Sequence, residues 1–337
     1  MQNENSNFKL AYLNEDGYSQ WDEFVKCSPQ GTFFNTIQWA DLLSSVYNRP
    51  FRILTCVKQS EILAGVIFFE NKRLIWKMIT PVFLFPFNGP LFQSTKDLKY
   101  QKIIADQLHY SGLLSEQLIK DFNYIMLKMH YETADIRSFQ WENYDIQPEY
   151  SYLFKLENEE QLEKNFNQSL RKKLRKCSEY NARIIESKDW NLFLSLYKSS
   201  YTRHKLRPPI KTAHLTTLLE KLLNFDNVRL IFAELDGKIV SGRIILFDDQ
   251  TIYDLLAGSS DESGLGSSFL VSEIMKKYYS KYAYFDFMGA GHPEIEKFKR
   301  GFGGKLVHGF QVSSQVTFPL SLFIKLRKYI LQSRRRM

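Results

Sequence analysis

Two stretches of the chain share one pattern, and this repetition limits the possible folds more than any other feature. Ile62–Phe69 (Ile-Leu-Ala-Gly-Val-Ile-Phe-Phe) aligns with Ile239–Leu246 (Ile-Val-Ser-Gly-Arg-Ile-Ile-Leu). A helix-like segment precedes each copy, Trp21–Phe24 in the first and Trp190–Phe193 in the second. Self-similarity at so long a period predicts two copies of one α/β unit, with chance likeness between apolar strands as the alternative.

The length of the chain agrees with two such units. At about 150 residues per domain, 337 residues are enough for roughly two domains that each bury a core. Gln147–Glu149, which contains a proline, interrupts the pattern between the copies. We therefore predict a first domain over residues 1–155, a second over 156–315 and a basic amphipathic helix over 316–337.

Each half alternates strand-like and helix-like segments, which predicts an α/β (α+β) fold of mixed, mostly antiparallel twisted sheets flanked by helices. Turns at Asp236-Gly237 and at residues 248–250 join three neighbouring strands, which favours antiparallel pairing. The predicted strands cover residues 51–56, 62–70, 228–234, 238–247, 251–257 and 284–288. The predicted helices cover residues 100–112, 159–181 and 267–282.

The cysteines and the charge distribution exclude several classes of protein. Cys27, Cys56 and Cys177 are odd in number and far apart, so we expect neither a disulfide scaffold nor a metal site. The formal net charge is +8, and residues 325–337 supply +6 of it, so the remaining chain lacks a uniformly basic surface. The first residues are polar and acidic, and prolines interrupt the most apolar stretch, so we expect no secretion signal, no membrane span and a cytoplasmic location.

The most informative segment runs from Tyr284 to Lys305. It begins with Tyr-Phe-Asp-Phe-Met-Gly-Ala, passes through an acidic turn and ends in Phe-Lys-Arg-Gly-Phe-Gly-Gly-Lys. This order predicts a buried strand, then a basic helical turn closed by glycines, which let a ligand or another backbone come close. Cations beside such glycines suit a phosphate or a developing oxyanion, although a solvated turn with C-capping glycines explains the same residues.

This segment resembles the closing signature of the Fem-type (FemAB/FemX-like) aminoacyl transferases, relatives of the GNAT acyltransferases. The likeness is specific over residues 165–310 and looser over the first half. The resemblance implies two tandem GNAT-like domains, the first on the acceptor side and the second on the acyl-donor side. It also implies an enzyme that moves an activated acyl or aminoacyl group.

The resemblance places a catalytic centre on the signature. Lys299 is implied to stabilise the oxyanion or a donor phosphate, and Asp286 is implied to orient the loop. We further expect Tyr253 or Asp254 to assist the loss of a proton from the attacking amine. The neighbours implied to pack beneath Lys299, bind donor or shape the turn are Phe298, Arg300, Gly301, Gly303 and Gly304.

Two other segments are candidates for donor binding. Gly264, Gly266 and Ser267 open a predicted helix at the place where GNAT enzymes hold the pyrophosphate of coenzyme A, although plain N-capping explains them equally. The basic helix that contains Arg171, Lys172 and Arg175 suits phosphates, with a solvated face as the alternative.

The sequence thus predicts an N-acyltransferase or aminoacyltransferase acting on an amine of a lipid- or nucleotide-linked cell-envelope precursor, in peptidoglycan or surface polysaccharide. We expect no tightly bound cofactor, and acyl-CoA or aminoacyl-tRNA as co-substrate. The chain lacks the long tRNA-gripping hairpin of the larger Fem ligases, which counts against aminoacyl-tRNA and leaves acyl-CoA or another thioester open. The alternatives are an acetyl-CoA-dependent N-acetyltransferase acting on a nucleotide sugar and a non-catalytic polyanion-binding scaffold. Residues 320–337 form a predicted amphipathic helix that either contacts the anionic inner face of the membrane or docks on the body of the protein. The sequence does not determine the oligomeric state.

Overall fold

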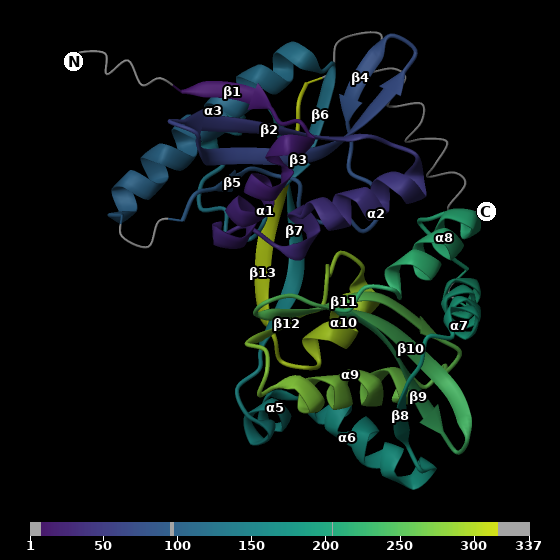
Figure 1. Cartoon of the computed structure of the whole chain (residues 1–337). Helices are drawn as coiled ribbons and strands as arrows, with labels where there is room; N and C mark the ends of the chain where they lie inside the picture. The colour runs from purple at the N-terminus through teal and green to yellow at the C-terminus, as the bar shows by residue number, and fades with distance from the viewer. Residues whose placement is uncertain (1–7, 95–97, 204, 316–337) are drawn as a thin grey trace. The chain divides into compact units, whose positions relative to one another are not determined.

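A computed structural model describes residues 8–94, 98–203 and 205–315 of the chain (Figure 1). These residues form two compact units, which divide between Pro148 and Glu149 and again between Val307 and His308. The predicted helix over 316–337, with its proposed membrane contact, lies outside the described residues. Among the described helices, none is both long enough and apolar enough to cross a membrane.

Unit 1 is a sheet in the order β1-β2-β3-β4-β6-β13, with β5 paired to β3. Neighbouring strands are antiparallel except β4 and β6, which are parallel. Its strands are β1 (Lys9–Tyr12), β2 (Phe51–Lys58), β3 (Glu61–Arg73), β4 (Trp76–Ile79), β5 (Leu91–Phe92), β6 (Tyr124–Lys128) and the end of β13 (Lys305–Ser313). Its helices are α1 (Tyr18–Cys27), α2 (Ile37–Tyr47), α3 (Tyr100–Asp121) and α4 (Arg137–Trp141), with short 3-10 turns at Glu15–Gly17 and Phe33–Asn35.

Unit 2 is a sheet in the order β7-β12-β11-β10-β9-β8, antiparallel except for the parallel pair β11 and β12. Its strands are β7 (Asp145–Lys155, from Glu149 onward), β8 (Arg183–Glu186), β9 (Val228–Leu235), β10 (Lys238–Phe247), β11 (Thr251–Ser259) and β12 (Tyr284–Asp286). Its helices are α5 (Glu159–Asn165), α6 (Gln168–Cys177), α7 (Trp190–Arg203), α8 (Thr212–Leu222), α9 (Leu265–Tyr278) and α10 (Pro293–Arg300), with a 3-10 turn at Ser178–Tyr180.

The repeated sequence pattern has the same structural cause in each unit. In β3, Gly65 leaves room for the buried ring of Trp21, which a Cβ would meet at 2.6 Å. In β10, a Cβ on Gly242 would meet the ring of Phe232 at 2.9 Å and that of Phe193 of α7 at 3.2 Å. Among the helix residues, Phe193 therefore makes the contact that Trp21 makes in the first unit, three residues after Trp190.

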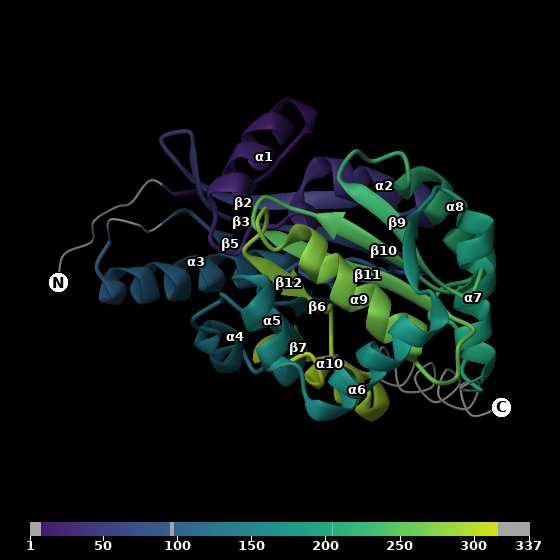
Figure 2. The same cartoon turned by 90° about the horizontal axis from the view of Figure 1, so that it is seen from below.

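Side chains alternate between the two faces of each of these strands, so each sheet is covered on both sides. In unit 1, Val66 and the β3 residues two positions before and after it pack in one apolar cluster with Leu114 and Leu118 of α3. In unit 2, Ile245 packs in a cluster with Leu270 and other residues of α9, opposite to the α7 side. Figure 2 shows α9 lying along this sheet.

The predicted single helix over 159–181 is wrong, because the chain breaks after Asn165. Asn167 has extended backbone geometry, and its side chain accepts a hydrogen bond from the N–H of Leu170, which begins α6 as a new helix. The N–H of Asn167 donates to the carbonyl oxygen of Gly301 at 2.9 Å. The break therefore joins α6 to the glycine-rich turn of the signature.

Candidate active site

A buried ion pair lies in the middle of the apolar strands of unit 2. Arg243 of β10 donates from Nη1 to Oδ2 of Asp254 of β11, and their side chains are only 5% and 4% exposed. The pairing of β10 with β11 shifts register between Ile244 and Ile245, and such a bulge re-aims side chains locally. Asp254 Oδ1 and Arg243 Nε find no hydrogen-bond partner among the described residues.

The ammonium group of Lys299, in the last turn of α10, sits in a cage of backbone carbonyls. Its Nζ donates to the carbonyl oxygens of Phe287 at 2.5 Å, Gly289 at 2.6 Å and Met288 at 3.5 Å. Three successive carbonyls can converge because Met288 and Gly289 both have positive φ, 54° and 87°. The glycine of the signature thus supplies a backbone conformation that other residues adopt only with strain.

The loop that forms this cage is fixed to β12 by Asp286. Its Oδ1 accepts hydrogen bonds from the hydroxyl of Ser151 at 2.6 Å and from the N–H of Met288 at 2.8 Å. The Ser151 hydroxyl oxygen also accepts from the N–H of Gly289 at 3.1 Å. Asp286 therefore orders the loop that holds Lys299.

The charges around Lys299 oppose one another. The pKa of Lys299 falls from 10.5 to about 8, chiefly because of burial; Asp254 and Asp286 raise it and Arg243 lowers it, and burial outweighs the two carboxylates. An amine in this condition is still mainly charged at neutral pH but is poorly hydrated, so its interaction with a developing negative charge is strengthened. The cluster can therefore stabilise an oxyanion.

The strands part next to this cluster. The parallel ladder between β11 and β12 pairs only Thr251–Tyr253 with Tyr284–Asp286, although β11 continues to Ser259. Asp254 is the first residue of β11 beyond the ladder, and the Lys299 loop follows the end of β12. The ladder thus ends beside the charged side chains.

The three glycines that close the signature lie against other backbone segments. A Cβ on Gly303 would be 2.3 Å from the carbonyl oxygen of Asn165, and a Cβ on Gly304 would be 3.2 Å from that of Leu153. A Cβ on Gly301 would approach the carbonyl oxygen of Phe298 at 3.0 Å. In this structure these glycines permit the turn to dock on the α5–α6 junction, and a direct contact with donor stays a prediction.

Gly303→Ala is expected to destabilise the protein by at least about 2 kcal/mol, because a left-handed conformation and a backbone clash coincide. Gly303 has φ +82°, so a residue with a Cβ is strained at this position even where there is room for the side chain. Gly237→Ala is the matched control, since Gly237 has φ +77° with open space around it, and should cost about 1 kcal/mol. Urea unfolding followed by circular dichroism measures both, and equal losses would contradict the proposed docking contact.

At the start of α9, a carboxylate already occupies the helix N-terminus. Asp261 accepts hydrogen bonds from the N–H of Gly266 at 2.9 Å and from the N–H of Ser263 at 2.8 Å. Burial would raise the pKa of Asp261, but the hydrogen bonds from the Ser263 hydroxyl and from these N–H groups outweigh it and lower the pKa. The positive end of α9 is thus neutralised by the chain itself.

The residues predicted to bind donor at this helix have structural contacts of their own. Gly264 has φ +68°, and a Cβ on Gly266 would meet Val240 at 2.4 Å. The hydroxyl groups of Ser267 and Ser241 lie 3.1 Å apart within hydrogen-bond distance. Gly266 and Ser267 therefore help to pack α9 on β10, whereas a Cβ on Gly264 would lie 3.1 Å from Nζ of Lys173. Donor binding by these three residues stays a prediction.

The basic helix α6 borders a pocket of about 970 Å³ within unit 2. Arg171 and Arg175 line it together with the apolar side chains of Phe166, Leu174 and Phe269. Lys172 is exposed and is not part of this lining. Two of the three predicted cations thus share one hollow, because residues four apart lie on the same face of a helix.

The remaining predicted residues surround the cluster less directly. Phe298 belongs to the signature helix α10, and the centre of its ring lies 5.6 Å from the guanidinium carbon of Arg243. Arg300 is exposed and donates to Glu296 at 2.7 Å. Burial raises the pKa of Tyr253 well above its usual value, and so this phenol is poorly suited to accept a proton.

Sequence reasoning did not select Arg243, and it named Asp254 only as one of two proton acceptors. The available signal was a charge inside an otherwise apolar strand: Arg243 stands where the first copy of the pattern has Val66. Val66 is fully buried among apolar side chains, so the corresponding place in unit 1 carries no charge. The described residues hold no cluster of His, Cys, Asp or Glu suited to a metal ion.

Part of the sequence matches a known family, and the fold matches solved structures. Residues 164–300, less than half of the chain, match the family described as an acetyltransferase (GNAT) domain. The fold is similar to that of FemX, with a TM-score of 0.69 and 14% identity over 94% of this chain and 99% of that chain. No curated protein sequence matches the chain.

Two further solved structures share the fold. One is the C-terminal domain of a putative lysylphosphatidylglycerol synthetase from Agrobacterium fabrum, with a TM-score of 0.55 and 12% identity over 90% of this chain and 93% of that chain. The other is L-PGS from Bacillus licheniformis, with a TM-score of 0.52 and 10% identity over 92% of this chain and 96% of that chain. The predicted tandem GNAT-like fold is confirmed.

Proposed function

We propose that the chain is a Fem-like GNAT acyltransferase, as the matched domain and the fold support, and that its second unit transfers an aminoacyl group from aminoacyl-tRNA to an amine of a cell-envelope precursor. The carbonyl cage around Lys299 and the ion pair beside it form the reaction centre. Unit 1, which has Val66 where unit 2 has Arg243, is proposed to serve the acceptor.

The observation that carries the choice of donor is the carboxylate of Asp261 at the start of α9. A coenzyme A pyrophosphate at this helix terminus would compete with Asp261 for the same N–H groups. Two negative groups that share the same N–H groups also repel one another. The helix terminus therefore favours a donor that places no diphosphate there.

The pocket beside α6 supports the same choice. Arg171 and Arg175 suit backbone phosphates, although the same lining also holds Lys276 and the carboxylates of Glu163 and Glu273. The ring of Phe269, which is partly exposed, suits a stacked base. Solved proteins of this fold include enzymes named for lysylphosphatidylglycerol, an aminoacylated lipid. Aminoacyl transfer to a lipid-linked or nucleotide-linked amine is therefore compatible with the fold.

The proposed reaction needs no nucleophilic side chain. The acceptor amine attacks the ester carbonyl of the donor, so that a C–N bond forms and an oxyanion develops near Lys299. Collapse of this intermediate breaks the C–O bond to the ribose, whose oxygen leaves as a hydroxyl with the proton that the amine gives up. The weakest hydrogen bond of Lys299, to Met288 at 3.5 Å, is the one that the oxyanion can replace. Asp254 Oδ1 is the better of the two predicted proton acceptors because it has no partner among the described residues.

A donor-binding experiment tests the proposal without knowledge of the acceptor. We expect calorimetry to detect no binding of acetyl-CoA to the wild-type protein, while a filter assay retains aminoacyl-tRNA. In the Asp261→Asn variant, which removes the charge and keeps the shape, acetyl-CoA binding should become measurable. Tight binding of acetyl-CoA to the wild type would instead favour the N-acetyltransferase alternative, and binding of neither donor would favour the scaffold.

A further inference from the structure

The hairpin between β3 and β4 carries exposed aliphatic side chains at its tip. Its last ladder pair is Arg73 with Trp76, so Leu74 and Ile75 form a two-residue turn. These side chains are 82% and 83% exposed, more than any other large hydrophobic residue in the described part of the chain. Figure 1 shows the hairpin projecting from the rest of unit 1.

The backbone conformation of this turn does not favour the residue types found there. Leu74 has φ +51°, in the left-handed region where hairpin turns favour Asn, Asp or Gly. A leucine there is strained and gains nothing from burial, and an isoleucine beside it doubles the exposed apolar surface. The chain therefore maintains two aliphatic side chains at the tip against local preference, which indicates a function outside the folding of unit 1.

Cations flank the apolar tip. Lys72 and Arg73 precede it and Lys77 follows it, and residues 71–77 contain no acidic side chain. Two carboxylates lie toward the base of the hairpin: Glu70 pairs with Arg52 at 3.6 Å, and Asp121 accepts hydrogen bonds from Tyr12 and Gln117. The outer part of the hairpin thus combines positive charge with an apolar end.

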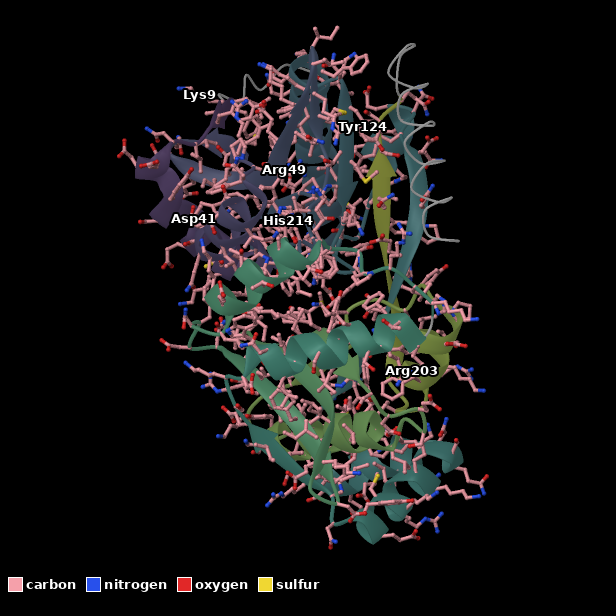
Figure 3. The ribbon with its side chains drawn as sticks, turned by 90° about the vertical axis from the view of Figure 1, so that its right-hand side faces the viewer. Lys9, Asp41, Arg49, Tyr124, Arg203 and His214 are labelled. Carbon is pink, nitrogen blue, oxygen red and sulfur yellow. The ribbon has the colours of Figure 1, made fainter. Side chains whose placement is uncertain are left out.

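The base of the hairpin is anchored in the unit. Trp76 packs with Met78, Met126 and Tyr124, the last of which Figure 3 labels. The N–H of Lys77 donates to Asn123 Oδ1 at 2.9 Å, and the N–H of Asn123 donates to the carbonyl oxygen of Lys77 at 2.8 Å. The tip is therefore presented by an ordered support, so little ordering is needed when it binds.

We propose that this hairpin binds the surface of an anionic lipid bilayer, with Leu74 and Ile75 inserted among the acyl chains and Lys72, Arg73 and Lys77 at the headgroups. Two aliphatic side chains are far too small for a stable protein interface, which buries about 1,000 Å² or more. They are sufficient for a shallow membrane contact assisted by charge. This inference concerns described residues and is independent of the predicted contact of residues 320–337 and of the acyl donor.

Sedimentation of the full chain with vesicles tests the inference. The probes are vesicles of equal parts phosphatidylglycerol and phosphatidylcholine, compared with phosphatidylcholine alone. The Leu74→Ser/Ile75→Ser variant should lower the partition coefficient on the anionic vesicles at least about tenfold. Lys72→Gln/Lys77→Gln should lower it by roughly fivefold per charge at low salt, with the loss shrinking as salt rises.

The control is Ile119→Ser, because Ile119 is an exposed aliphatic residue (43%) of α3 in the same unit. It should leave vesicle binding unchanged. If the Leu74→Ser/Ile75→Ser variant binds anionic vesicles as well as the wild type, another segment carries the contact and the inference is wrong. If that variant instead changes the oligomeric state without vesicles, the tip binds protein and the inference is equally overturned.

Discussion

Lys299→Met is expected to lower turnover by roughly 10²–10³-fold, the loss seen when a preorganised oxyanion donor is removed. Methionine keeps an apolar stem of similar length but removes the ammonium group that holds the carbonyls of Phe287 and Gly289. Two effects then combine, because the oxyanion loses its charged partner and the signature loop loses its central contact. Single-turnover transfer of a labelled aminoacyl group to an amine acceptor measures this loss.

Lys297→Met is the matched control, since Lys297 lies two residues away on the same helix α10, on another face, and is exposed. It should retain turnover within about twofold. A second readout is pH: because the pKa of Lys299 is about 8, its charged fraction falls as the pH rises through that value. Wild-type turnover should therefore decline above pH 8, and the residual activity of Lys299→Met should not. Wild-type turnover in Lys299→Met would remove this residue from the mechanism.

Asp254→Asn is expected to destabilise the protein by about 3–5 kcal/mol, because it leaves the buried guanidinium of Arg243 without a counter-charge. Both side chains of the pair are almost completely buried, so water cannot replace the missing carboxylate. Lys299, whose charge Asp254 also stabilises, would face a second uncompensated cation. The free energy of unfolding in urea, followed by circular dichroism, gives the magnitude.

Two further variants separate stability from activity. Glu160→Gln removes an exposed partner of Lys164, at 2.7 Å in the wild type, and should cost less than about 1 kcal/mol. Arg243→Met/Asp254→Leu replaces the pair by apolar side chains, which recovers most of the lost stability in buried pairs of this kind. This double variant should fold and yet be inactive. An active double variant would show that the ion pair is structural alone.

The part of the site that sequence reasoning located is the part encoded by neighbouring residues. The order of strand, glycine, acidic turn and Phe-Lys-Arg-Gly places Lys299 one short helix after the loop that cages it. The break after Asn165 was missed, although asparagine is a preferred N-cap and the signal was present. The exposed tip at Leu74 and Ile75 was also missed, because hydrophobicity alone does not tell an exposed residue from a buried one.

The sequence by itself determined the duplication of an α/β unit, the alternation of strands and helices, and the glycine-rich signature, because each follows from local periodicity and backbone preference. Only the tertiary structure decided that Arg243, Asp254 and Lys299 belong to one cluster and that Asp261 neutralises the start of α9. Those associations depend on strand register, on a bulge and on the docking of α10. Such long-range geometry is set by the packing of the whole unit, and no short stretch of residues encodes it.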